Sequence, residues 1–248
     1  MSRVERVTSE AVAAYRTFLR RRTAVFFTFF FPVLLIVIFA GLVRTQTGGG
    51  GLFSEPTAYY VPAYLATVVL FTPLSRIGST VARFREGNRF EKLATTPLTR
   101  GEWLAAHTLV NAALIAAASA VLLVALLLTG ASFALSPWLV VFVLGGSVLF
   151  CGVGAVLGSV AEGQDGAIAM SNGIALPLLF LSETFIQPDL FPAWFRPVVD
   201  LSPLAYFARG VRAATYSSNG DVVTNAAVVV VLAVVAFAVG AVVIPWTE

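Results

Sequence analysis

The residue types that carry out most enzymatic chemistry are scarce in this sequence. Its 248 residues include one cysteine, Cys151, and one histidine, His107, so no Cys/His set has the spacing of a zinc or haem site. The one lysine, Lys92, follows Glu91 and not a glycine, so the sequence contains no Walker A phosphate loop. We therefore expect this chain to bind no metal ion and no cofactor, and to leave any ATP chemistry to another protein.

His107 and Glu183 are the two residues that could form a catalytic pair inside a membrane. Such an enzyme, for instance a protease or a lipid-modifying transferase, needs paired groups at the same depth, such as Glu with His. The apolar segments described next place His107 and Glu183 near opposite faces of the bilayer. We therefore predict no catalytic residues and no enzyme activity, and keep an intramembrane enzyme as an alternative.

The elements that position these residues are long apolar segments. Apolar residues make up 58% of the chain and charged residues 12%, and the mean hydropathy is +0.88, which excludes a soluble monomer. A bilayer core about 30 Å thick needs roughly 20 apolar residues in a helix. Six segments reach that length: 23–43, 58–82, 103–129, 138–161, 167–185 and 222–246. We predict an all-α integral membrane protein with six transmembrane helices, built as one domain over residues 1–248.

Basic residues are divided unevenly between the two sides of these segments. One side has eleven, namely Arg3, Arg6, Arg16, Arg20, Arg21, Arg22, Arg83, Arg85, Arg89, Lys92 and Arg100. The opposite side has four, namely Arg44, Arg196, Arg209 and Arg212. Because basic flanks stay in the cytoplasm, we predict a multi-pass plasma-membrane protein with both termini cytoplasmic. The first segment is too long for a signal-peptide core and is interpreted as an uncleaved anchor.

Two regions outside the six segments are expected to lie along the membrane surface. Residues 1–22 form an amphipathic pattern, with an apolar arc made of Val4, Val7, Ala11, Ala14, Tyr15, Phe18 and Leu19. This arc predicts an interfacial helix that leads into the first segment. Between the fifth and sixth segments, Ser202 and Pro203 open a short helix whose apolar face predicts an outer or re-entrant segment. Residues 48–51, all glycine, predict a flexible outer loop.

The loop at residues 83–102, between the second and third segments, predicts a short amphipathic helix with a defined exit. Phe90 and Leu93 are three residues apart among charges of both signs. Thr99 with Glu102 forms a capping box, and Leu98 with Trp103 would form a hydrophobic staple. The third helix should therefore begin at Arg100.

Two stretches of the sequence resemble the ABC-2 type transporter permeases. One is Phe-Glu-Lys-Leu-Ala-Thr-Thr-Pro-Leu-Thr-Arg at 90–100; the other is Leu-Phe-Pro-Ala-Trp-Phe at 190–195, followed by Leu-Ser-Pro-Leu at 201–204 and by Arg212. Their order, with six segments and the N-terminal helix, extends the resemblance over essentially the whole chain. Two departures stand out: Asn88 occupies a position where the family usually has Gly, and Glu183 follows Ser182 where Gly is frequent.

The resemblance implies an export permease that works as a pair of membrane halves, this chain with a second copy or a homologue. Two separate ATPase subunits would hold the ATP and Mg²⁺, and the loop at 83–102 would act as the coupling helix. The implied ATPase contacts are Arg85, Glu86, Arg89, Phe90, Glu91, Lys92 and Leu93. Membrane lipid is the other expected partner, and no nucleic acid is expected.

Three residues at the fifth segment are candidates for the substrate pathway: Asn172, Ser182 and Glu183. Glu183 could line an exit path or simply reach headgroup water, and polar residues such as Asn172 often join helices by hydrogen bonds. We expect Arg76, near the end of the second segment, to extend to the interface. We expect Gly154 and Gly158 to pack within the chain. A secondary transporter and a purely structural subunit remain alternatives.

Overall fold

The computed structural model describes residues 2–38, 56–185, 191–216 and 220–246, and the ordered elements in these ranges are all helical. The elements are α1 (Arg3–Leu19), α2 (Arg22–Ile36), η2 (Thr57–Tyr60), α3 (Val61–Glu86), α4 (Arg89–Ala94), α5 (Arg100–Leu128), α6 (Trp138–Val160), α7 (Gln164–Phe180), α8 (Arg196–Asp200), α9 (Pro203–Thr215) and α10 (Val222–Val243). The predicted outer loop at 48–51 lies outside the described residues.

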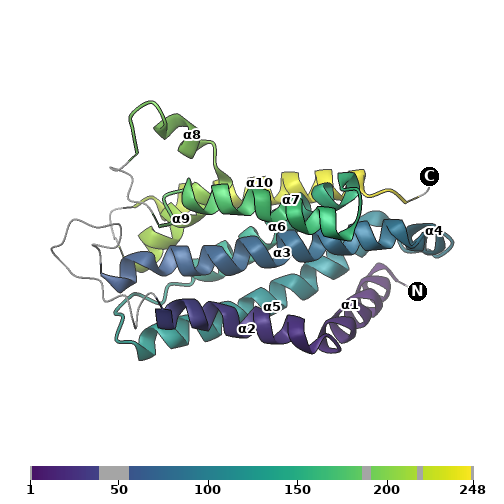
Figure 1. The fold of residues 1–248 in the computed structure, drawn as a ribbon, viewed down its shortest axis with the longest axis horizontal. Coiled ribbons are helices and arrows are strands. Elements are labelled where there is room, and N and C mark those ends of the chain that lie inside the picture. The colour runs from purple at the N-terminus through teal and green to yellow at the C-terminus, as the bar shows by residue number, and fades with distance from the viewer. Residues whose placement is uncertain (1, 39–55, 186–190, 217–219, 247–248) are drawn as a thin grey trace.

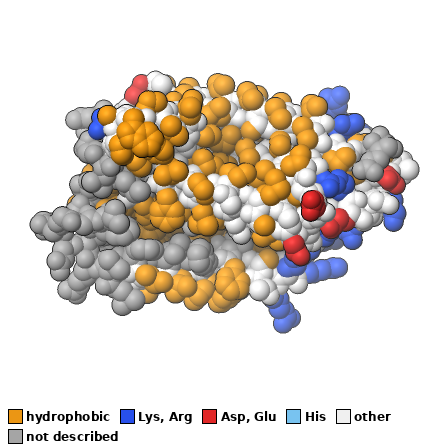
Figure 2. All heavy atoms as spheres, turned by 45° about the horizontal axis from the view of Figure 1, so that its top comes forward, with side chains coloured by type: hydrophobic (Ala, Val, Ile, Leu, Met, Phe, Trp, Pro, Cys, Tyr) orange, Lys and Arg blue, Asp and Glu red, His pale blue; other side chains and the backbone are white. Residues whose placement is uncertain are grey.

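The long helices run beside one another along the longest axis of the molecule (Figure 1). Helix α3 packs against α6 and α7, and α6 packs against α10. One end of this bundle carries α1, α4 and the last residues of α10, and we call it the α4 end (Figure 1). The opposite end carries α8 and α9, and we call it the α9 end. Figure 2 shows an apolar surface along the middle of one face, with most of the visible charged side chains at the α4 end.

Within the described residues, four helices are long and apolar enough to cross a membrane: Thr57–Glu86, Arg100–Leu128, Trp138–Val160 and Val222–Val243. Each coincides with a predicted segment, so a membrane protein built of apolar helices is confirmed. The other two predicted segments correspond to shorter helices, α2 with 15 residues and α7 with 17. Residues 39–43 of the first segment lie outside the described residues. The six-span topology therefore stays a prediction.

Local sequence signals explain where several helices begin. The Thr99 side chain accepts a hydrogen bond from the Glu102 backbone, and the Glu102 carboxylate accepts one from the Thr99 backbone, so the predicted capping box and the start at Arg100 are confirmed. Asp221 caps α10 by accepting from the Thr224 backbone N–H at 2.9 Å. Helix α7 ends earlier than predicted, at Phe180, and Glu183 just beyond it has a left-handed φ of 57°.

Small residues let the central helices approach closely. A Cβ atom on Gly154 would lie 2.8 Å from the Leu74 carbonyl oxygen of α3, and one on Gly158 would collide with Gly78. On the other side of α6, a Cβ on Gly240 of α10 would lie 2.7 Å from the Gly152 carbonyl oxygen. The predicted packing of Gly154 and Gly158 within the chain is therefore confirmed, because α3 occupies their face.

Helix α1 is amphipathic as predicted, but part of its apolar arc faces protein. Ala11, Ala14 and Phe18 are buried, in a cluster with residues of α5 such as Ala106 and Val110. Of the other large residues of the arc, Val4, Tyr15 and Leu19 are exposed, and Val7 is half-buried against the same cluster. The arc therefore packs in part on α5, and the interfacial position of α1 stays a prediction.

Candidate functional site

The predicted coupling loop forms a sharp turn followed by the short helix α4, which lies at the far end of the bundle (Figure 1). Asn88 makes this turn with a φ of 50° and a ψ of 35°, in the left-handed region. Asn tolerates this conformation better than most residues other than Gly, because its short polar side chain can hydrogen-bond locally. The turn therefore forms despite the departure at this position.

Phe90 holds α4 against the bundle. Its side chain is only 3% exposed, and its ring centroid lies 5.0 Å from that of Trp103, 5.4 Å from Phe84 and 5.6 Å from Trp246. The expectation that Phe90 touches a partner directly is therefore corrected, since α3, α5 and the end of the chain already enclose the ring. A ring in this position instead fixes the orientation of α4.

The charged face of α4 points outward. Arg89, Glu91 and Lys92 are exposed, and the Arg89 guanidinium lies 5.4 Å from the centre of the Phe84 ring. Leu93 is half-buried and packs at the edge of the aromatic cluster. The structure thus brings these predicted contact residues together on one short helix.

Arg85 and Glu86 act on the turn between α6 and α7. The Arg85 guanidinium donates to the carbonyl oxygens of Gly158, Ser159 and Ala161, the last at 2.6 Å. The Glu86 carboxylate accepts from the backbone N–H of Gln164 at 3.3 Å, in the first turn of α7. A cation at the C-terminus of one helix and an anion at the N-terminus of the next both complement the helix dipoles. The end of α3 is therefore tied to the start of α7.

Two polar pairs fasten α1 to α5, and the sequence patterns did not reveal them. Arg6 forms a two-pronged pair with Glu102, with Nε to Oε2 at 3.0 Å and Nη2 to Oε1 at 2.5 Å. Nε2 of His107 lies 3.2 Å from Oε1 of Glu10. Glu102 thus both caps its own helix and holds α1. These pairs join residues more than 90 positions apart, so no local signal announces them.

Glu183 lies at the α9 end in a buried ion-pair network. Its carboxylate accepts from Arg209, with Nε to Oε2 at 2.9 Å and Nη2 to Oε1 at 2.5 Å, and it is 6% exposed. Arg209 also donates to Asp200 at 2.7 Å, and Arg212 donates to the Glu183 carbonyl oxygen at 2.6 Å. The hydrogen bonds from Glu183 raise the pKa of Arg209 above its ordinary value. The expectation that Glu183 simply reaches headgroup water is corrected, since arginines of α9 surround it.

The other two predicted pathway residues have different surroundings. Ser182 is buried, and its hydroxyl lies 2.8 Å from that of Ser202, the residue that precedes α9. Asn172 is exposed on α7, ten positions before Ser182, which corresponds to about 15 Å along a helix. The structure therefore brings Ser182 and Glu183 together against α9 and leaves Asn172 separate.

The arrangement offers no evident catalytic centre. His107 pairs with Glu10 at the α4 end, while Glu183 pairs with Arg209 at the α9 end, so they do not meet. In the part of the chain that the structure describes, no three His, Cys, Asp or Glu residues lie close enough to hold a metal ion. Instead, the short helix α4 projects at one end of the bundle, and the ion pair between Glu183 and Arg209 joins the end of α7 to α9 at the other.

Comparison with known proteins agrees with this arrangement. The family model described as ABC-2 type transporter matches residues 11–216. The chain is also 28% identical over 200 residues to the daunorubicin resistance ABC transporter permease protein DrrB1 of Streptomyces coeruleorubidus, an alignment that covers 76% of this chain and 67% of that protein. The family model covers most of the chain, so this chain belongs to the ABC-2 type transporter family.

Proposed function

We propose that this chain is the membrane half of an ATP-driven exporter and that a separate ATPase subunit binds at α4. The observation that carries the proposal is α4 itself, a helix of six residues at the end of the bundle, fixed from inside by Phe90 and charged on its outer face. The sequence has no phosphate loop of its own, so in an ATP-driven exporter the ATP would be hydrolysed by another chain. The similar permease from Streptomyces is named for daunorubicin resistance, which supports export as the direction.

Contacts inside the chain support a route from α4 to the opposite end. A displacement of α4 would move the aromatic cluster around Phe90 and the end of α3 with it. Arg85 and Glu86 tie that end to the turn before α7. Helix α7 leads in turn to Ser182 and Glu183, which contact α9. Rigid helices joined by charge-assisted hydrogen bonds can transmit such a displacement over this length.

We propose two roles for the pathway residues. Ser182 and Glu183 close the α9 end by holding α7 to α9 while their partners, Ser202 and Arg209, are engaged. Asn172 lies on an exposed face of α7 and is the remaining candidate for direct contact with substrate. A second copy of the chain, or a homologue, would complete the pathway as the other membrane half, with both termini in the cytoplasm.

A charge swap on α4 tests the proposal. In Glu91→Lys/Lys92→Glu the net charge is unchanged, but the positions of the negative and the positive side chain that would face the ATPase are exchanged. Transport per ATP hydrolysed, measured in proteoliposomes with the ATPase that purifies with the chain, should fall about tenfold, because like charges face each other across the contact.

The matched control swaps one exposed cation and one exposed anion elsewhere at the α4 end, in Arg16→Glu/Glu162→Lys. It should couple as the parent does. Normal coupling in the α4 variant, or equal losses in both variants, would rule out α4 as the ATPase contact.

A further inference from the structure

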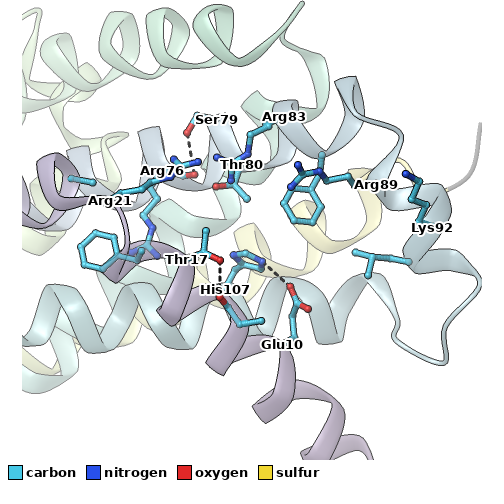
Figure 3. Close-up of a pocket in the computed structure, with 16 residues that line it drawn as sticks. Glu10, Thr17, Arg21, Arg76, Ser79, Thr80, Arg83, Arg89, Lys92 and His107 are labelled. Atoms are coloured by element: carbon cyan, nitrogen blue, oxygen red, sulfur yellow. Dashed lines mark hydrogen bonds and ion pairs between the residues drawn. The ribbon is translucent and has the colours of Figure 1, made fainter.

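A pocket of about 650 Å³ at the α4 end shares Arg89, Lys92 and Leu93 with α4, but its walls on α1 and α3 have no part in the roles proposed above. It lies between α1, α3 and α4, with single residues from α2 and α5 completing its walls (Figure 3). Pockets of this volume commonly bind small ligands or parts of larger ones. Its lining therefore indicates which ligand chemistry would fit.

The pocket lining is strongly basic. It includes five cationic side chains, namely Arg21, Arg76, Arg83, Arg89 and Lys92. The only acidic residue in the lining is Glu10, which lies 3.2 Å from His107 and thus already has a partner. Low-dielectric walls lined by one sign of charge concentrate the opposite ion, so this pocket attracts anions.

Two of these arginines have buried donors without an acceptor. Nη1 of Arg76 and Nε of Arg83 are buried, and neither donates a hydrogen bond to any residue that the structure describes. The Arg76 guanidinium instead lies over the Phe18 ring, 4.4 Å from its centre. Leaving a buried charged donor unpaired is costly. By contrast, Arg85, only two residues beyond Arg83, has carbonyl acceptors.

The unpaired donors form a row with hydroxyl groups. Arg76, Thr80 and Arg83 are spaced i, i+4 and i+7, which places them on one face of α3. Figure 3 shows these side chains, with Ser79, in succession along the helix. Guanidinium and hydroxyl groups in a row match the several acceptor oxygens of a phosphate, which arginine binds in two-pronged geometry.

The surface next to the pocket is suited to a lipid. An adjoining pocket shares Arg21 and Ala24 with the first and continues past Arg22 to Phe27. Beyond it, α2 exposes Phe26, Phe27 and Phe30. A basic pocket followed by an apolar strip along a predicted membrane helix matches a phosphate headgroup followed by acyl chains. A free anion would leave the aromatic strip uncovered.

We propose that this pocket binds the phosphate of an anionic phospholipid, with the headgroup on Arg76 and Arg83 between α1 and α3 and the acyl chains along α2. The lipid would complete the hydrogen bonding of both arginines and would hold α1 to α3. The site depends on neither the direction of transport nor the identity of the ATPase.

The lipids that remain on the full-length chain test this site. After purification from vesicles of phosphatidylglycerol and phosphatidylcholine, the parent should retain phosphatidylglycerol in excess over its share of the bilayer. In Arg76→Gln/Arg83→Gln this preference should fall about 30-fold, since each arginine near a membrane surface contributes about a factor of five. The matched control, Arg3→Gln/Arg16→Gln, removes two exposed arginines of α1 outside both pockets and should keep the preference.

A second measurement does not depend on folding of the arginine variant. A cysteine at Thr17, on the pocket wall, should react with a thiol reagent more slowly in phosphatidylglycerol vesicles than in phosphatidylcholine. A cysteine at Ser9, on α1 outside the pocket, should react equally in both. Both cysteines are placed in a Cys151→Ala background.

Three results would overturn the proposal. One is a parent that retains both lipids in the bulk ratio, and another is equal labelling at Thr17→Cys in both vesicles. The third is full protection of Thr17→Cys in phosphatidylcholine by inorganic phosphate, which would make this a site for a free anion. None of these readouts involves ATP hydrolysis or transport, so the coupling proposal stands or falls separately.

Discussion

Two pairs of arginines, one at each end of the helical bundle, have different surroundings. At the α9 end, Arg209 and Arg212 both donate hydrogen bonds to Glu183, by way of its carboxylate and its carbonyl oxygen. At the α4 end, Arg76 and Arg83 have buried donors with no acceptor in the part of the chain that the structure describes. Nε of Arg212 is also buried without an acceptor in the described residues, so the difference lies in the surroundings: Arg209 and Arg212 meet Glu183, whereas Arg76 and Arg83 line a pocket.

This contrast shows how much an arginine's acceptor matters. A count of basic residues gives Arg83 and Arg209 equal weight in predicting orientation. Their surroundings differ, because Arg209 joins two helices and Arg83 faces a pocket. An arginine that donates to groups within the chain indicates a structural contact, whereas an arginine with an unpaired buried donor that also lines a pocket is a candidate for binding a ligand.

Cysteine labelling from outside the cell should show the largest difference between the two ends of the bundle, because each position either reacts or does not. In a Cys151→Ala background, a cysteine at Trp194, where the native side chain is 76% exposed at the α9 end, should react with an impermeant thiol reagent in intact cells. Cysteines at Ser2 and Asn88 should react only after permeabilisation, because the basic flanks predict a cytoplasmic α4 end. Labelling of Asn88→Cys in intact cells would reverse the orientation. Two other outer positions that the sequence suggests for labelling, Gly49 and Asn219, lie outside the described residues.

Removing the Phe90 ring should produce the largest loss of stability. Phe90→Ala should lower the free energy of unfolding by about 4 kcal/mol, since it leaves a cavity in an enclosed aromatic cluster. Thermal unfolding in detergent measures the loss, and transport per ATP should fall because α4 is no longer fixed. Leu93→Ala is the control and should cost less, as Leu93 is only half-buried. A Phe90→Ala protein as stable as its parent would show that the cluster does not anchor α4.

Breaking the ion pair at the α9 end should have a smaller effect. Glu183→Gln should cost about 2 kcal/mol, less than the roughly 3–5 kcal/mol of a fully buried pair, because a partly exposed Arg209 keeps Asp200 as a partner. Asp200→Asn should change stability by less than about 0.5 kcal/mol, since the Asp200 side chain is 55% exposed.

Transport by Glu183→Gln distinguishes a residue that only holds helices together from one that contacts substrate. If Glu183 only holds α7 to α9, cationic and neutral substrates should lose transport equally. A larger loss for cationic substrates would instead place Glu183 in contact with them, because only they lose a charge attraction.

Weakening the link at the α6–α7 turn should have a smaller effect than removing the Glu183 carboxylate. Arg85→Gln should cost about 1.5 kcal/mol, because an amide cannot replace a guanidinium that serves three carbonyl oxygens. Hydrogen exchange should rise at residues 158–164 while the α9 end stays unchanged. Arg85→Lys keeps the positive charge at the end of α6 and should lie between the parent and Arg85→Gln. Unchanged exchange in Arg85→Gln would remove this link from the proposed route.

Elements with a local signal were predicted well from the sequence. The capping box of Thr99 and Glu102 placed the start of α5 at Arg100, and Asp221 marked the start of α10. Four of the predicted apolar segments coincide with helices in the described residues that are long enough to span a membrane. These signals succeed because capping and hydrophobic burial in a helix depend on residues within a few positions of one another.

The contacts of individual charged and aromatic side chains could not be predicted from such local signals. Arg85, Glu86 and Phe90 were all expected to contact an ATPase, and the sequence did not reveal that Arg85 also caps α6, that Glu86 also binds the start of α7 or that Phe90 is buried. Their partners lie on helices distant in the sequence.

The sequence by itself therefore determined a membrane bundle of apolar helices, the ends of several of these helices and the absence of a phosphate loop. Only the tertiary structure decided which charges are paired within the chain, such as Glu183 with Arg209, and which are left to face a pocket, such as Arg83. The physical reason is that an arginine takes whichever acceptor the packed helices bring within about 3 Å, and that acceptor can lie anywhere along the chain.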